Sequence, residues 1–518
     1  MLGRRPRPGL FDAGALLDVD RLDGIYALLA KNGRQLFTDY QFRRLFARTG
    51  RSSASPALMA LTCLLQHAEG ISDRKAIERV KYDLRWKAAL DLDPLDVRAP
   101  FSKTAYVGWR ARLVLNEKQA VAFEKSVQEA VRAGLLPRKL RVALDGSPVR
   151  SRGALKDTYN LLADAIRKVV RAIAKAGEEA PEKAAERLGV GRHFEAQSIK
   201  GSELVDWESP EAVRVFLKGL LDDGRRVSGE AALRGCAGNE VELLSKIVEQ
   251  DVDQDEELPK IKQEVAKDRT VSASDPEARH GRKSTGKTYT GHKVHVAVAV
   301  ETGVVTACEV SSPSEAEGAH VKALVEQTEQ TTGLKVSEAL GDCAYGTATA
   351  VEQAKAVRVE LRSRMPAPPK GRFGPGDFEV SEDRRAARCP AGHPSATVRG
   401  KKDVVHFWST ERCRECPLRE RCSSGKNGRS LRVRPDFHSR RAREKWARSP
   451  RGRAKLKKRV AVEHAIGRAK ARGAGKSRFF GRVMTRFQWL WTCAVDNLLR
   501  VASLVEAARG KQPAAASA

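Results

Sequence analysis

Three acidic residues that lie far apart in the chain have the surroundings expected of a metal-dependent active site. Asp145 follows the apolar run KLRVAL, and Asp342 follows KVSEALG. Both runs read as strands, and a carboxylate that ends a buried strand and precedes a small residue is well placed to face a crevice. The third residue, Glu463, lies in the apolar-periodic part of the basic segment KKRVAVEHAIGRAKARG, residues 457–473.

These carboxylates would support one kind of chemistry if they met. Three converging carboxylates repel each other and raise each other's pKa unless a cation lies between them. Mg²⁺ prefers oxygen ligands and is held by few carboxylates together with phosphate oxygens of the substrate. Two such ions, about 3.5–4 Å apart, activate a hydroxyl nucleophile and stabilise the leaving oxygen of a phosphodiester. We therefore expect Asp145, Asp342 and Glu463 to be catalytic and to bind two Mg²⁺ or Mn²⁺ ions.

The helix that carries Glu463 has the charge of a segment that meets a polyanion. Glu463 is one of only two acidic residues between 437 and 495. Arg459 precedes it by four residues and Lys470 follows it by seven, so the three share a helical face. A surface salt bridge between Glu463 and Arg459 is the simpler alternative. The side chains expected to contact DNA are those of Arg459, Lys470, Arg468 and Lys476.

The composition points to the same partner. The chain has 518 residues, too many for one hydrophobic core, and a net charge of +30. Nucleic acid is the first candidate for such a surplus, and a proteome rich in Arg and Ala is the alternative explanation. No stretch approaches the ~20 apolar residues that span a bilayer, and the basic N-terminus lacks the apolar region of a secretory signal. We expect a cytoplasmic, nucleoid-associated protein without membrane contact.

Helices are expected throughout residues 1–135. Ser55, which precedes a proline, and Ser102 can each start a helix, and Ser72 can cap one that continues to Ala88. Short helices joined by a glycine turn resemble a helix-turn-helix DNA-binding module. An ordinary helical bundle with a solvated basic face is the alternative. The basic residues expected on the surface are Arg74, Lys75, Arg79, Lys81, Arg85 and Lys87.

The two later segments 136–365 and 440–508 are expected to form one catalytic core. The expected elements are a strand over 139–145, a helical insertion at about 155–265, a β-hairpin over 291–311, a helix over 315–330, and strands that end at Asp342 and cover 357–363. Helices are expected from 440 to 508. The acidic patch 251–257 reads as a solvated linker, and the tail 509–518 reads as disordered.

Several motifs together resemble the DDE transposases of bacterial insertion sequences, over almost the whole chain. LDGSPVRSRG is similar to the segment that holds the first Asp of that family, and LGDCAYG is similar to the second. GHKVHVAVAVETGVVTACEVSSPSEAEGAHVKALVE is similar to the central hairpin and the following helix. The third family motif places Tyr, Arg, Glu and Lys at fixed intervals. Arg459, Glu463 and Lys470 keep those intervals, whereas Leu456 stands in place of the Tyr.

The resemblance implies an α+β or α/β fold with an RNase H-like mixed sheet flanked by helices, preceded by an all-α domain. It implies that Asp145, Asp342 and Glu463 form the metal-binding triad and that Arg459 and Lys470 contact the transposon end. The implied reaction is strand transfer, in which water cuts the donor strand and the freed 3′-OH attacks target DNA. Pairing of two ends implies a homodimer. A metal-dependent nuclease of the same fold and a catalytically inactive DNA-binding regulator are the alternatives.

Two aromatic residues are candidates for contact with DNA bases. Tyr345 and Trp489 are candidates to stack on splayed bases near a cut end, and core packing is the alternative for Trp489.

The region 366–439 is expected to be a small Cys-rich insertion. Its residues Cys389, Cys413, Cys416 and Cys422 have the spacing of a structural zinc site, with His393 as a substitute for one thiolate. Reduced, unliganded cysteines are the alternative, because the outer spacings are irregular. The chain has nine cysteines, an odd number that argues against a disulfide framework. Three more, Cys63, Cys308 and Cys493, lie in apolar runs and are expected in the core.

Overall fold

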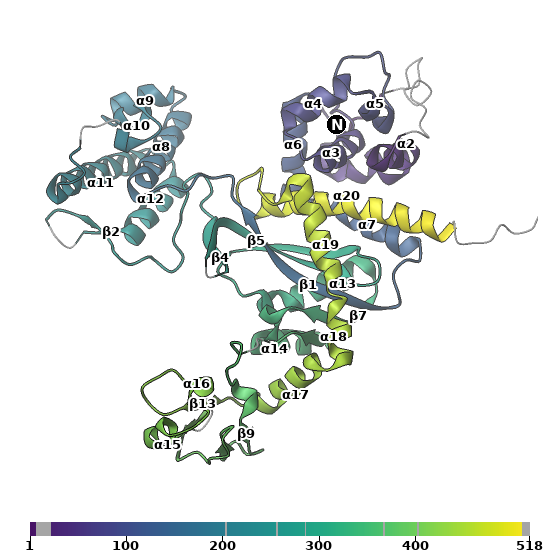
Figure 1. Ribbon diagram of the computed structural model, residues 1–518. Coiled ribbons are helices and arrows are strands. Elements are labelled where there is room, and N and C mark those ends of the chain that lie inside the picture. Colours follow the sequence, from purple (N-terminus) through teal and green to yellow (C-terminus); the bar gives the residue numbers. More distant parts are fainter. Residues whose placement is uncertain are drawn as a thin grey trace, which may run out of the picture.

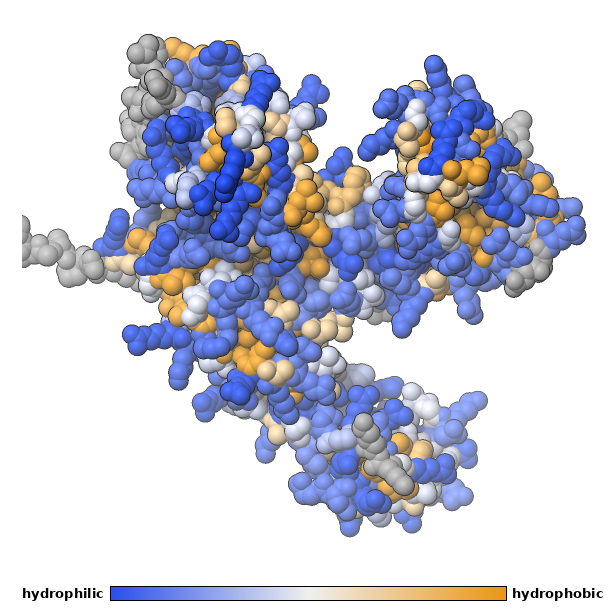
Figure 2. Space-filling model, turned by 180° about the vertical axis from the view of Figure 1, so that it is seen from behind, coloured by the Kyte–Doolittle hydropathy of each residue, from blue (hydrophilic) through white to orange (hydrophobic). Residues whose placement is uncertain are grey.

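The computed structural model describes residues 1–6, 22–201, 205–254, 257–284, 286–365, 368–400 and 403–509. A mixed sheet lies at the centre, and three groups of elements surround it: the N-terminal helices, the helical insertion and a small Cys-bearing lobe (Figure 1). Seen from behind, a wide hollow separates the N-terminal helices from the insertion (Figure 2). Within the ranges given, no helix has both the length and the apolar character needed to cross a membrane. The tail expected to be disordered lies, after Arg509, outside the described residues.

Serine caps start three of the N-terminal helices, as the sequence predicts. The side chains of Ser55, Ser72 and Ser102 each accept a hydrogen bond from a backbone N–H of the first turn. The helix expected to run from Ser72 to Ala88 is interrupted at Asp83, because the Asp83 side chain caps a second helix. The helices of this region are α2 (Gly24–Leu36), α3 (Pro56–Glu69), α4 (Asp73–Tyr82), α5 (Leu84–Leu90), α6 (Lys103–Leu115) and α7 (Val121–Arg132).

The N-terminal helices share one hydrophobic core with the last helix, α20 (Arg482–Arg509), and with one face of the sheet. Helix α3 is buried along almost its whole length, because the helix itself carries apolar residues on all sides. Trp491 of α20 packs edge-on against Trp109 of α6, with ring centroids 6.0 Å apart. Its indole N–H donates to the Gln119 carbonyl at 3.0 Å. Trp489 is also buried, which favours the core interpretation of that residue.

The central sheet has the strand order β8–β7–β1–β5, with β4 and β6 both paired to the remaining edge of β5. Strands β1, β7 and β8 are parallel, and β5 runs antiparallel to β1. Helices α13 (Val321–Thr332) and α14 (Ala348–Ala356) connect the later strands. The expected hairpin and the strand before Asp342 are thus confirmed. The strands are β1 (Lys139–Arg150), β4 (Arg279–Ser284), β5 (Lys287–Ala299), β6 (Val305–Ser311), β7 (Lys335–Gly341) and β8 (Glu360–Ser363).

Strand β1 is longer than the sequence indicates. The expected end at Asp145 is wrong, since β1 continues through Pro148 to Arg150. Its pairing with β7 stops at Ala143, whereas its pairing with β5 extends to Arg150. Beyond Ala143 the strand is therefore free of β7 on one side, and proline is tolerated at such an edge because its missing N–H disrupts no ladder.

The helical insertion after β1 has its own hydrophobic core. The interpretation of 251–257 as a solvated linker is wrong at its first two residues, because Asp251 and Val252 are buried and Val252 pairs with Ile261. Asp251 is buried, accepts a hydrogen bond from Thr158 at 2.9 Å and pairs with Arg269. Residues 255 and 256 lie outside the described ranges. The helices of the insertion are α8 (Thr158–Ala176), α9 (Pro181–Arg187), α10 (Arg192–Glu195), α11 (Pro210–Leu233) and α12 (Gly238–Asp251).

The part of the chain from Phe378 to Phe437, called here the cysteine lobe, consists of short elements. Its strands are β9 (Glu379–Val380), β10 (Ala387–Arg388), β11 (Thr397–Arg399), β12 (Val404–Phe407) and β13 (Ser430–Val433), and its helices are α15 (Thr410–Arg414) and α16 (Arg419–Cys422). Among its described residues, only seven apolar side chains form a buried cluster. Outside the lobe, the three cysteines expected in the core, Cys63, Cys308 and Cys493, are buried.

The C-terminal helices are α17 (Phe437–Arg448), α18 (Pro450–Lys457), α19 (Val460–Ala469) and α20. A short π-helical turn, Lys470–Ala474, ends α19, and Gly473 within it has φ of 87°, which glycine adopts without strain. The chain then runs beside the end of β1, where Arg150 N–H donates to the Gly475 carbonyl at 3.0 Å. This contact fixes α19 against the strand that carries Asp145.

Candidate active site

Asp145 and Asp342 are brought together by the register of two parallel strands. The last paired residues of β1 and β7 are Ala143 and Leu340, and each aspartate lies two residues further along the chain, Asp342 just after the end of β7. Asp145 accepts a hydrogen bond from the Gly146 N–H at 2.9 Å, and Asp342 accepts one from the Ala344 N–H at 2.8 Å. The backbone thereby holds both carboxylates at the same edge of the sheet.

Helix α19 brings Glu463 to this edge through Arg459. The Arg459 guanidinium lies 3.3 Å from Asp145 Oδ2 and also donates to Glu463 Oε1. Arg459 precedes the first residue of the helix, and Glu463 lies in its first turn. The Asp145 side chain is 19% exposed, whereas that of Glu463 is 50% exposed, so the cluster has a buried and an open side. One guanidinium thus connects two acids from opposite ends of the catalytic region.

The charged groups of the cluster shift one another's pKa. Burial raises the pKa of Asp145 to about 6, although the Arg459 guanidinium opposes this rise. The carboxylates of Asp342 and Glu463 add to it, as expected for converging negative charges. Burial lowers the pKa of Lys470, and Asp145 acts in the opposite direction, so Lys470 also lies near the cluster.

The donor atoms of this cluster suit a hard divalent cation, because all are carboxylate oxygens. Nevertheless, within the described ranges no group of three or more His, Cys, Asp or Glu side chains is already arranged to hold a metal ion. Arg459 provides a physical reason, since its guanidinium occupies the space between Asp145 and Glu463 and neutralises both. A metal ion on these two carboxylates would have to replace that contact.

A fourth carboxylate, Glu317, lies at the site and was not anticipated from the sequence. A Cβ added to Gly146 would lie 2.7 Å from Glu317 Cδ, so the Glu317 carboxylate packs directly against the backbone beside Asp145. Burial raises the pKa of Glu317, Lys293 lowers it, and Asp342 and Asp145 raise it further. Glu317 begins the short helical turn that follows β6. An acid at a helix start is too common a pattern to mark a site without knowledge of the sheet register.

The four expected DNA contacts have different surroundings. Arg468 forms a two-pronged ion pair with Asp496 of α20 at 2.7 and 2.8 Å, so its guanidinium joins two helices. Arg459 is engaged with two carboxylates. For Lys470 and Lys476, no ion pair is found within the described part of the chain, and Lys476 is exposed.

Tyr345 does not have the expected access to a ligand. Its side chain is fully buried in the core beside the sheet, three residues after Asp342 in the chain. The interpretation of Tyr345 as a base-stacking residue is therefore wrong, because a stacked base needs an exposed ring face.

Two segments of the chain match known protein families. Residues 388–502 match the family model described as a transposase DDE domain. Residues 20–112 match a model described as a transposase domain (DUF772). The first match contains Arg459, Glu463 and Lys470 as well as all four clustered cysteines, and the second contains helices α2 to α5 and most of α6. No curated protein and no solved structure matches the chain.

Proposed function

We propose that this chain cuts DNA at the ends of an insertion sequence and joins those ends to target DNA. Its two family matches support a DDE-type transposase of such an element. The observation that carries the proposal is the contact of one guanidinium with both Asp145 and Glu463, next to Asp342. Acids from three separate elements meet at one sheet edge, although each alone would be an ordinary polar residue.

The sheet topology supports an RNase H-like core. An antiparallel hairpin, β5–β6, lies beside β1, and the parallel strands β7 and β8 lie on the opposite side of β1. We assign residues 136–365 and 440–508 to this core, with an insertion at about 155–265. Residues 366–439 form the Cys-rich insertion, and 1–135 form the DNA-binding part, which contains the second family match.

The carboxylates would hold two Mg²⁺ or Mn²⁺ ions, with Asp145 and Asp342 fixed by the sheet and Glu463 supplied by α19. When bound, the ions supply positive charge that activates the attacking oxygen and stabilises the leaving oxygen of the phosphodiester. Arg459 releases the two acids and becomes free to contact a phosphate. Lys470 and Lys476 bind the DNA backbone, and Arg468 keeps α19 in position against α20.

The partners of this reaction are the two ends of the element and the target DNA. Because two ends must be held together, we propose that a homodimer acts in the paired complex. The reaction takes place where the DNA is, in the cytoplasm on the nucleoid. The net charge of +30 is in keeping with such a substrate.

The test is incubation of the purified chain with labelled DNA that carries the inverted repeats from both sides of its coding region. With Mg²⁺ and a supercoiled plasmid as target, strand-transfer products are expected. Cleavage without joined products would identify a nuclease, and a band shift without any chemistry would identify an inactive DNA-binding protein. A scrambled repeat of the same composition is the matched control and should remain uncut.

A further inference from the structure

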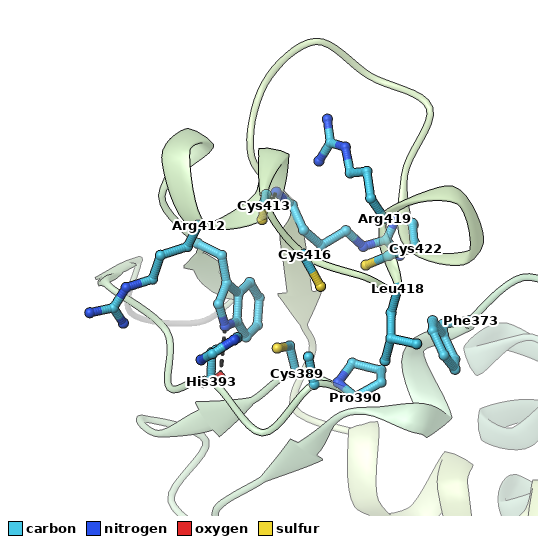
Figure 3. Close-up of a pocket in the computed structure, with 13 residues that line it drawn as sticks. Phe373, Cys389, Pro390, His393, Arg412, Cys413, Cys416, Leu418, Arg419 and Cys422 are labelled. Carbon is cyan, nitrogen blue, oxygen red and sulfur yellow. Dashed lines mark hydrogen bonds between the residues drawn. The ribbon is translucent and has the colours of Figure 1, made fainter.

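The cysteine lobe contains a second cluster of chemically active side chains, which the proposed reaction does not use. Cys389 follows β10, Cys413 lies in α15, Cys416 follows that helix, and Cys422 ends α16. All four line a single small pocket, and their sulfur atoms face the same space (Figure 3). Each of these thiols is free and partly buried.

Backbone hydrogen bonds fix the local structure around two of the four cysteines. At the first, Cys389 N–H donates to the His393 carbonyl at 2.9 Å and Gly392 N–H donates to the Cys389 carbonyl at 2.8 Å, which closes a tight turn. Gly392 has φ of 80° in this turn. At the second, the Arg429 N–H lies 3.5 Å from Cys413 Sγ and donates to it. Backbone N–H groups directed at sulfur stabilise a negatively charged thiolate.

The charges around the pocket favour thiolates that share a cation. All four sulfurs face one small pocket, so they would repel one another when ionised unless a cation lay between them. Three guanidinium-bearing residues also line the pocket, namely Arg412, Arg419 and Arg429. Four thiolates with one divalent ion carry a net negative charge, which these arginines would offset.

The cysteine lobe also lacks the means to hold its shape by burial alone. Its buried cluster contains seven apolar residues among those described, and three of the cysteines, Cys389, Cys413 and Cys422, pack against that cluster. Its strands are two to four residues long. Segments with so little core generally need a metal ion or disulfides to fold stably.

We propose that Cys389, Cys413, Cys416 and Cys422 bind one Zn²⁺ ion, which holds the cysteine lobe together. On binding, each thiol loses its proton to water and its sulfur forms a bond to zinc, in the tetrahedral four-thiolate arrangement of structural sites. Within the described ranges the sulfurs are not yet spaced as a metal cage. His393 is exposed and contributes only its backbone carbonyl to the turn.

The lobe lies in the chain between the strand that follows Asp342 and the helix that carries Glu463. Its end continues into α17, where Trp446 stacks under the Arg362 guanidinium of β8 at 4.3 Å from the ring centroid. The zinc site would thus fix the path by which the third carboxylate returns to the sheet. Its existence does not depend on the proposed reaction, since an inactive protein would also contain the metal.

The direct test is the zinc content of the full chain purified under reducing conditions, measured by elemental analysis. About one zinc per chain is expected for the natural sequence. The double variant Cys413→Ser/Cys416→Ser should contain none, whereas Cys236→Ser, a half-buried cysteine of the insertion, should retain it. Absence of zinc from the natural sequence, or full retention by the double variant, would overturn the proposal. Loss of zinc from His393→Ala would overturn the assignment of four cysteines as the ligand set.

A second measurement avoids the risk that a variant fails to fold. In the natural chain, alkylation followed by mass spectrometry should find these four thiols protected until a chelator removes the metal. Half-buried Cys236 of the insertion, which belongs to neither proposed metal site, should react equally fast before and after chelation and serves as the internal control. If the four thiols react as fast as Cys236 in untreated protein, or form disulfides with one another, the proposal fails.

Discussion

The carboxylate cluster and the cysteine lobe obtain their geometry in opposite ways. Asp145, Asp342 and Glu463 come from two strands and a distant helix, and a core that extends from α3 to α20 holds these elements. The four cysteines come from the short segment 389–422, and few apolar residues surround them. In the first region the fold positions the charged groups. In the second region, by our proposal, a bound Zn²⁺ ion stabilises the short segments that carry its ligands.

The largest expected effect is on catalysis at the carboxylate cluster. Replacing Asp145, Asp342 or Glu463 with Ala should slow strand joining by roughly 10³-fold or more, because each removes a ligand that acts only in the reaction. Binding of the element's end should stay nearly unchanged. Single-turnover rates and gel shifts measure the two quantities. Glu506→Gln, at an exposed acid near the end of α20, is the matched control and should keep full activity.

Trp491→Ala should destabilise the core that holds the carboxylate cluster without affecting the cysteine lobe. The indole is fully buried, contacts Trp109 and donates to the Gln119 carbonyl, so its removal should lower the free energy of unfolding by about 3–5 kcal/mol. Urea denaturation measures this change, and Val483→Ala, on an exposed position of the same helix, should alter it by less than about 0.5 kcal/mol. Protection of the four clustered thiols from alkylation should be unaffected. Loss of that protection would show that the two regions fold as one unit.

The raised pKa of Asp145 predicts a stability that depends on pH when no metal is present. The folded form keeps this proton up to about pH 6, whereas the unfolded chain releases it near pH 4, so stability should fall as the pH rises between those values. The Asp145→Asn variant has no such proton and should be more stable than the natural chain at pH 7, by at most about 3 kcal/mol. Urea midpoints at pH 4.5, 5.5 and 7 in chelator measure this. Identical pH profiles for the two proteins would contradict the origin given for the shift.

The smallest effects are expected at the two lysines without ion pairs. Lys470→Ala and Lys476→Ala should each weaken binding of any DNA sequence and reduce the slope of log affinity against log salt by about 1, because each removes one phosphate contact. Fluorescence anisotropy at several salt concentrations gives the slope. Lys355→Ala, near the end of α14, is the control at a similar charge. A slope unchanged by both variants would remove these lysines from the DNA-binding surface.

Local signals in the sequence predict much of the fold. The caps at Ser55, Ser72 and Ser102, the hairpin of β5 and β6 and the strand before Asp342 all depend on residues close in the chain, and all are confirmed. The break at Asp83 was missed because the apolar spacing continues across it, while its side chain satisfies the N–H groups of the next helix.

Features that depend on distant partners were harder to predict. The continuation of β1 through Pro148 requires knowledge that β7 no longer pairs there. The spacing of Arg459 and Glu463 indicates a shared face, but the additional contact of Arg459 with Asp145 follows only from the position of α19 on the sheet. Glu317 reaches the site because Gly146 leaves room for it, a relation between residues on different elements.

The turn between α3 and α4 has a consequence for how the protein measures DNA. A Cβ on Gly70 would lie 2.7 Å from the Arg472 carbonyl, and Arg478 donates to the carbonyl of Ile71, so backbone meets backbone where the N-terminal helices join the segment after Glu463. The close backbone contact fixes the position of the N-terminal helices relative to the carboxylate cluster. If these helices bind the element's terminal repeat, this fixed position sets the number of base pairs between the bound sequence and the cleaved bond. That number should then be the same for every copy of the element.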